Sequence, residues 1–304
     1  MISFYTRQIT QLRRGNSGQA AVLFLTTASA ILVLFFYTIY SAHVGAAKVA
    51  SSNSVDAIAL SAATWEARGL NIIASLNDGI LQCLRAIRYI CVVWAALAVA
   101  ACFGAGMPAF TAYSQRAPVM IRSYWNCAKQ LEAWAEKVKK TTPFLVLAET
   151  ADLSRKLDVA GIISPVNPNG RHDDNNTLEL HLKHGSPLFL IDALGPITGI
   201  PGQLGNWKWA KKIAGTITQI INSALQSILG AGPEPIRMLE PEEDFPRRQK
   251  IQYAGFKTVT SPSLPYIGIG GRKRYFSEAF SEPYGGGMAE MTWKSRLIDK
   301  PRKP

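Results

Sequence analysis

The chain has 304 residues, of which 48% are hydrophobic and 18% charged, and its formal net charge is +12. This length allows one or two domains with a real core, and the low proportion of charge indicates that part of the chain lies in lipid. The basic residues are scattered in small groups without a helix-turn-helix or similar signature, so we expect no nucleic-acid partner. A basic chain of this kind can still bind anionic lipid or an acidic protein.

The N-terminal region contains an uncharged run that is long enough to cross a membrane. Residues 20–40 would extend about 30 Å as a helix, which is the thickness of a bilayer core. A signal peptide has a shorter apolar core, so we predict a retained transmembrane helix that anchors the chain. Arg7, Arg13 and Arg14 precede this run and no basic residue follows it directly. That asymmetry predicts that residues 1–19 lie in the cytoplasm.

Small residues continue beyond the anchor through 41–88 and predict a helical stem. They also leave cleavage at the start of this segment open as an alternative. Alanines spaced by four lie on one face of a helix, and such faces let neighbouring helices approach closely. The residues expected to pack against other subunits are Ala46, Ala50, Ala59, Ala63 and Trp65. The competing interpretation is an alanine-rich helix that packs on its own domain.

Two stretches of the N-terminal region carry a family pattern. The first is RRGNSGQAAVLF at 13–24, and the second is NSVDAIALSAATWEARGLNIIASLN at 53–77, in which Asp56 precedes a small-residue segment. Together they resemble the TadE/TadG-like proteins of Tad (Flp) pilus assembly, which are minor-pilin or pseudopilin-like proteins of the bacterial inner membrane. A weaker similarity covers EPYGGGMAEMTWKSRLIDK at 282–300, and the middle of the chain is not covered.

This resemblance implies a non-enzymatic role in the assembly of a type IV-like filament or secretion system. The partners would be other pilus or platform subunits, further copies of the chain among them, and the C-terminal region would be periplasmic. Processed pilins of this type are cleaved after a glycine and carry a glutamate early in the mature helix. If Gly15 were the cleavage site, Ala20 would be the fifth mature residue and the uncharged Gln19 would precede it. We therefore expect an accessory member with an intact N-terminus.

A second uncharged run, at 89–107, raises the question of a second span. Its length permits a transmembrane helix at 89–109, its alanine content favours a buried core helix, and we expect Pro108 to end it. Two spans would return the C-terminal region to the cytoplasm, as a scaffold that binds an ATPase or anionic lipid through its basic clusters. One span would leave that region outside, and packing against neighbouring helices without crossing is a third alternative.

The rest of the chain predicts a helical region at 110–163 and a mixed α/β region at 164–304. An amphipathic stripe at 119–140 and a shorter helix after Pro143 belong to the first region. The second region contains an amphipathic helix at 206–230 and short strands, which are expected at 177–181, 251–259, 276–283 and 289–298. The fold class is therefore an α+β membrane protein, with a long N-terminal transmembrane helix extended beyond the bilayer, a helical middle and a small strand-containing C-terminal region.

The helix at 206–230 begins with tryptophan beside lysine, a composition typical of a membrane surface that contains anionic lipid. The candidate contact residues are Trp207, Lys208, Trp209, Lys211 and Lys212. The competing interpretation is a helix that covers a sheet.

Few residues are candidates for catalysis or for metal binding. The cysteines, at 83, 91, 102 and 127, form no C-x-x-C pair, so a zinc or thioredoxin-like site has little support. Cys91 and Cys102 lie inside an apolar run, which favours buried small residues over a disulfide or a reactive thiol. An envelope enzyme or a metal site would have to use His172, Asp174, His181 and His184. Neighbouring residues of a loop cannot all face one ion, and no paired carboxylates or P-loop accompany them. We therefore predict no catalytic residues, no metal and no cofactor.

Overall fold

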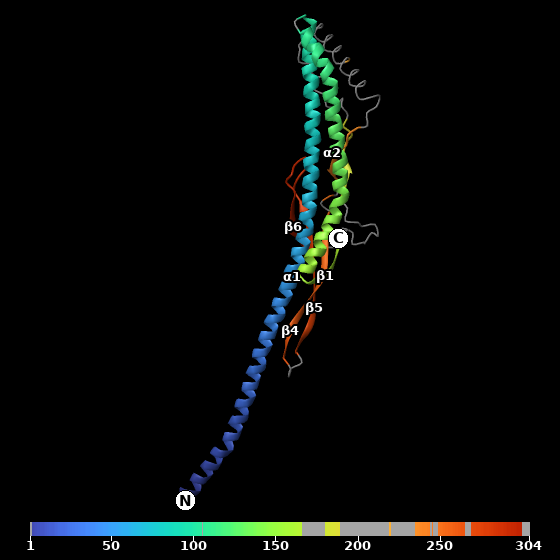
Figure 1. Cartoon of the computed structure of the whole chain (residues 1–304). Coiled ribbons are helices and arrows are strands. Elements are labelled where there is room, and N and C mark those ends of the chain that lie inside the picture. The colour runs from blue at the N-terminus through green and yellow to red at the C-terminus, as the bar shows by residue number, and fades with distance from the viewer. Residues whose placement is uncertain are drawn as a thin grey trace.

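Figure 1 shows the computed structural model of the chain, in which one very long helix carries a second helix and a small sheet on its distal half. The structure describes residues 2–104, 106–165, 180–188, 219, 235–243, 245, 249–264 and 269–299. The side chains of residues 2–19, 165, 261–264 and 269–270 lie outside the description. The elements are α1 (Ile2–Cys102), α2 (Met107–Lys156), β1 (Val159–Pro165), β2 (Leu182–His184), β3 (Leu239–Pro241), β4 (Ile251–Leu264), β5 (Ile269–Tyr284) and β6 (Lys294–Ile298). The α+β fold class expected from the sequence is confirmed.

Helix α1 is a single rod of 101 residues and is therefore about 150 Å long. The first proline of the sequence is Pro108, so no proline interrupts its backbone hydrogen bonds. The predicted anchor, the stem at 41–88 and most of the second apolar run form one continuous helix. The predicted helix end at Pro108 is wrong, because α1 ends at Cys102 and Gly104 turns the chain with a φ of +79°. Pro108 instead lies in the first turn of α2, where its missing N–H costs no hydrogen bond.

Helix α2 runs back along α1 and forms an antiparallel helical hairpin with it (Figure 1). Its buried residues include Ile121, Trp125, Ala128 and Ala135, which confirms the amphipathic stripe predicted at 119–140. The predicted break at Pro143 is wrong, since α2 contains this proline and continues to Lys156.

Four antiparallel strands in the order β1-β4-β5-β6 pack on α1 beyond the predicted anchor. Tyr253 of β4 is fully buried there against Val55 and Ala59 of α1, and its hydroxyl lies 2.7 Å from Ser154 Oγ of α2. Strands β2 and β3 form a separate antiparallel pair. The sheet therefore joins the C-terminal region to both long helices.

The predicted strands at 251–259 and 276–283 are confirmed, and both extend further as β4 and β5. The strand predicted at 289–298 forms only as β6, and the strand predicted at 177–181 is displaced to β2, with 177–179 outside the described residues. The helical region predicted at 110–163 ends earlier, because β1 begins at residue 159. Of the helix predicted at 206–230, only residue 219 is described, and it is helical.

The two long helices pack closely beside Gly69, which predicts a large response to a side chain there. A Cβ atom at this position would lie 2.5 Å from the side chain of Thr142 on α2. We expect Gly69→Leu to lower the free energy of unfolding by about 1–3 kcal/mol or more, through overpacking. Gly45→Leu is the matched control, because a Cβ there meets nothing within 4 Å. Thermal unfolding followed by circular dichroism checks this, and equal melting temperatures for both variants would contradict it.

Candidate functional site

The first segment of α1 whose side chains are described, residues 20–40, is left almost entirely uncovered by the rest of the described residues. From residue 20 to residue 40 nearly every side chain is exposed, including Phe24, Leu34 and Phe35. In the described residues, α1 is the one helix long and apolar enough to cross a membrane, and its most apolar window lies in this unburied stretch. Large exposed apolar surfaces of this kind are found where lipid or other proteins bind.

The serine and threonine hydroxyls described in this segment are satisfied within the helix itself. The hydroxyls of Thr26, Thr27, Ser29 and Thr38 each donate to a backbone carbonyl three or four residues earlier, at 2.8–3.0 Å. A hydrocarbon environment demands such internal pairing, because no water is present to replace it. The segment is therefore suited to lipid, because its backbone and its serine and threonine hydroxyls are hydrogen-bonded within the helix and it carries no charge.

Basic side chains of β5 lie at the level where the predicted anchor ends. Lys273 donates a hydrogen bond to the Tyr40 hydroxyl, with its nitrogen 4.8 Å from the centre of the Tyr40 ring, and this hydrogen bond raises the pKa of Lys273. Arg272 and Arg274 are exposed on either side of it. Cations placed here can meet lipid headgroups. The sequence analysis missed this contact, because strand pairing brings β5 to α1 from more than 200 residues away.

The predicted small-residue faces divide into two groups. Ala46 and Ala50 are exposed, so they are available to a neighbouring subunit. Ala59 and Ala63 are fully buried in the chain's own core. Ala59 packs with Val159 and Tyr253, while Ala63 belongs to a cluster with Val146 and Ile251. For these two alanines the interface interpretation is corrected to intramolecular packing.

The remaining predicted positions are placed as follows. Trp65 is half-buried on α1, with the Arg68 guanidinium 4.8 Å above its ring. The backbone of Arg7, Arg13 and Arg14 belongs to α1, but their side chains lie outside the described residues. The predicted membrane-surface residues Trp207, Lys208, Trp209, Lys211 and Lys212 also lie outside the described residues.

Within the described residues, no group of three or more His, Cys, Asp or Glu side chains could hold a metal ion. His184 Nε2 lies 3.1 Å from Glu136 Oε1, so this histidine connects β2 to α2. Lys139 of α2 also donates to the backbone carbonyl of Leu182, at 2.6 Å. These polar contacts join the small β2–β3 sheet to the helical hairpin. His172 and Asp174 lie outside the described residues.

The cysteines are placed along the helical hairpin. Cys91 is buried, as predicted, and so is Cys83. The same prediction is wrong for Cys102, which is exposed beside the turn, and Cys127 is exposed as well. The Cys83 and Cys127 side chains lie within hydrogen-bonding reach across the two helices, and burial is the main cause that raises the pKa of the Cys83 thiol to about 11. At that pKa the thiol is almost wholly protonated near neutral pH and therefore a weak nucleophile.

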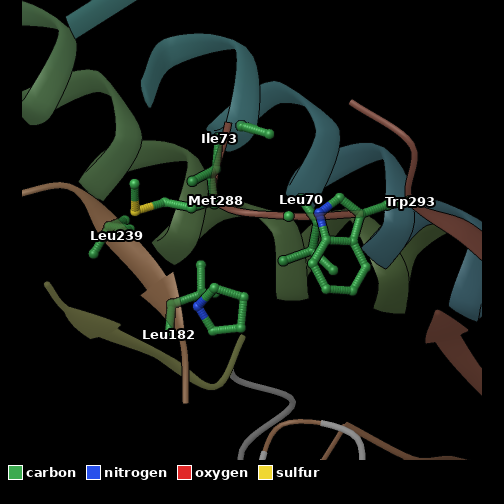
Figure 2. Close-up of a pocket in the computed structure, with 9 residues that line it drawn as sticks. Leu70, Ile73, Leu182, Leu239, Met288 and Trp293 are labelled. Atoms are coloured by element: carbon green, nitrogen blue, oxygen red, sulfur yellow. The ribbon is translucent and has the colours of Figure 1, made fainter. Parts of the chain in front are cut away.

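A small apolar gap lies between α1, the β2–β3 pair and the segment before β6 (Figure 2). Its volume is about 10 Å³, which is the space of one water molecule. The lining side chains shown there include Leu70, Ile73, Met288 and Trp293. This gap is a packing defect in an apolar layer and offers neither the room nor the polar groups of a substrate site.

Two asparagines of α1 hold the C-terminal segment on the helix. Asn77 Nδ2 donates to the backbone carbonyls of Leu239 and Met288, each at 2.8 Å, and is buried. Asn71 both donates to and accepts from the backbone of Trp293, at 3.1 and 3.0 Å. Both lie in the stretch that carries the family resemblance. In this chain their side chains fix the strand-bearing region to the stem.

Glu66 is the one acidic side chain of α1 that is fully enclosed among the described residues. Desolvation raises its pKa from 4.5 to about 8, and a hydrogen bond with Gln249 opposes this shift. No described residue bonds its Oε2 atom. A carboxyl group in this environment carries its proton at neutral pH, which makes the stem sensitive to pH.

Comparison with known proteins adds no assignment to this geometry. No protein-family model, no curated protein and no solved structure matches the chain.

Proposed function

We propose that this chain is a non-enzymatic inner-membrane component of Tad (Flp) pilus assembly, similar to TadE/TadG-like minor pilins or pseudopilins. The observation that carries the proposal is the contrast along α1. The side chains of residues 20–40 are apolar and exposed, whereas from residue 51 onward one face of the helix is buried by the sheet and by α2. A helix of this kind requires lipid or neighbouring helices around residues 20–40. From residue 51 onward it packs against α2 and the sheet, and these elements together form what we call the head.

The surface that meets partners would be the exposed face of α1 directly beyond the anchor. Ala46 and Ala50 lie there, and Val49 adds an exposed apolar side chain between them. The Lys273–Tyr40 contact would set the distance of the head from the bilayer. Orientation with the N-terminus in the cytoplasm follows from the arginines at 7, 13 and 14.

The alternative is a two-span scaffold with a cytoplasmic C-terminal domain. The straight stem separates Tyr40 from Tyr89 by about 70 Å along the helix, more than twice the thickness of a bilayer core. The two apolar runs therefore cannot cross the same bilayer in this conformation. This geometry favours the single-span, pilin-like proposal.

Bulky substitutions in the exposed face test the proposal in pilus-producing cells. We expect Ala46→Trp and Ala50→Trp to abolish pili while the melting temperature of the purified protein stays unchanged. Ala148→Trp, at an exposed alanine of α2, is the matched control and should leave pili intact. Ala59→Trp should instead unfold the head, because that alanine is buried. Normal pili in a strain that lacks the chain would overturn the assignment.

A further inference from the structure

The turn of the helical hairpin forms an end of the molecule that the proposed function does not use. We call residues 89–115 the tip; they comprise the end of α1, the turn and the start of α2. The tip contains no Asp, Glu, Lys, Arg or His. Because the chain turns back after Cys102, each arm of the tip is at most about 20 Å long, and the tip lies at the far end of α1 from the N-terminus (Figure 1).

Four polar side chains of the tip find partners within the hairpin. Trp94 Nε1 on α1 donates to Ser114 Oγ on α2 at 2.9 Å. The Tyr113 hydroxyl bonds a backbone carbonyl of α1, and the Thr111 hydroxyl bonds a carbonyl of its own helix. Two backbone N–H groups of the turn also donate to carbonyls of the last turn of α1. Polar groups in contact with water do not need such internal hydrogen bonds, whereas polar groups inside a bilayer do.

Large apolar side chains nevertheless point outward from the tip. Phe103 is 69% exposed at the turn, and Tyr89, Val99 and Met107 are also exposed. They are not needed inside the hairpin, because Trp94 and its neighbours already fill the space between the two helices. An apolar surface of this kind marks a binding site for a partner that is itself apolar.

The charge of the residues next to the tip indicates which apolar partner it binds. No Asp or Glu occurs between Asp78 and Glu132, so the outer part of the hairpin carries only positive charge. Arg85 and Arg88 on α1, and Arg116 on α2, are exposed just below the tip and form a basic collar around it. An apolar end above a cationic collar matches the surface of an anionic bilayer, where each basic residue contributes about 1 kcal/mol.

We propose that the tip is a second lipid-binding site, which inserts into an anionic bilayer other than the one that holds the anchor. An arm of about 20 Å reaches beyond the middle of a 30 Å hydrocarbon core without crossing it. The separation of about 70 Å between Tyr40 and Tyr89 excludes insertion of both ends into one flat bilayer. The chain would thus connect two lipid layers, whichever filament it serves.

Vesicle docking with the full-length protein tests this proposal. The purified chain is reconstituted through its anchor into immobilised liposomes, and fluorescent protein-free vesicles of phosphatidylcholine with phosphatidylglycerol are added. We expect docking, and we expect Phe103→Asp to reduce it at least about tenfold, because an apolar contact is replaced by a charge at the lipid surface. Phe144→Asp is the matched control, since Phe144 is 71% exposed on α2 far from the tip. Replacing all three collar arginines by glutamine should reduce docking and its sensitivity to salt.

Three results would overturn the proposal: no docking of the wild-type chain, equal docking of Phe103→Asp and Phe144→Asp, or docking only between two vesicles that both carry the protein. The last result would identify a second copy of the chain as the partner. Circular dichroism shows whether each variant is folded, and Phe103→Ser replaces the aspartate variant if that one is not. Docking uses purified protein alone, so its failure is distinguishable from a failure of the pilus assignment.

Discussion

Replacing Val33 by arginine should remove the chain from the membrane, whereas the same change at Val49 should not. The two valines lie on one helix and are equally exposed, at 60% and 59%. Only the position of the proposed bilayer distinguishes them, since Val33 lies within 20–40 and Val49 lies beyond it. An arginine near the centre of a transmembrane helix costs about 2.5–3.5 kcal/mol, which corresponds to a roughly 70- to 400-fold shift of the insertion equilibrium.

Alkaline carbonate extraction of cell membranes measures this effect. We expect the fraction of Val33→Arg that resists extraction to fall strongly, and that of Val49→Arg to match the wild-type chain. Because both valines are largely exposed, neither substitution should change the melting temperature of the head. Equal extraction of the two variants would contradict the placement of the bilayer at 20–40, and the pilus proposal would then lose its anchor.

Neutralising Glu66 should remove most of the dependence of stability on pH between about 5 and 8. In the unfolded chain Glu66 ionises near pH 4.5, whereas in the folded stem it holds its proton to about pH 8. Below pH 4.5 both states are protonated and Glu66 contributes no pH dependence. Between these values unfolding releases a proton, so the free energy of unfolding falls by roughly 1.4 kcal/mol for each pH unit as the pH rises. Above about pH 8 the folded group also ionises and the slope ends.

Glu66→Gln keeps the shape of the side chain without the titrating proton. We expect this variant to be more stable than the wild-type chain at pH 7 by a few kcal/mol, and equally stable at pH 4. Urea unfolding followed by circular dichroism at several pH values measures both quantities. Glu290→Gln, at an exposed position, is the control that should retain the wild-type slope. A wild-type stability that does not change between pH 5 and pH 8 would show that the Glu66 carboxyl is not enclosed as described.

The sequence alone predicted the features that depend on local pattern. The lack of charge over 20–40 is a property of consecutive residues, and so is the three-and-four spacing that places Ile121, Trp125 and Ala128 on the buried face of α2. The strand at 251–259 was found for the same reason, because alternation is visible within the segment itself. These patterns determine which element forms and which of its faces is apolar.

Only the tertiary structure decided what covers each face. Ala46 and Ala59 look alike in sequence, but the sheet reaches Ala59 and leaves Ala46 exposed. The second apolar run has the composition of a membrane span, yet the glycine turn after Cys102 folds it into the end of a hairpin. The physical reason is that the spacing of apolar residues shows which face of an element must be buried. What buries that face depends on strands and helices that are distant in the chain.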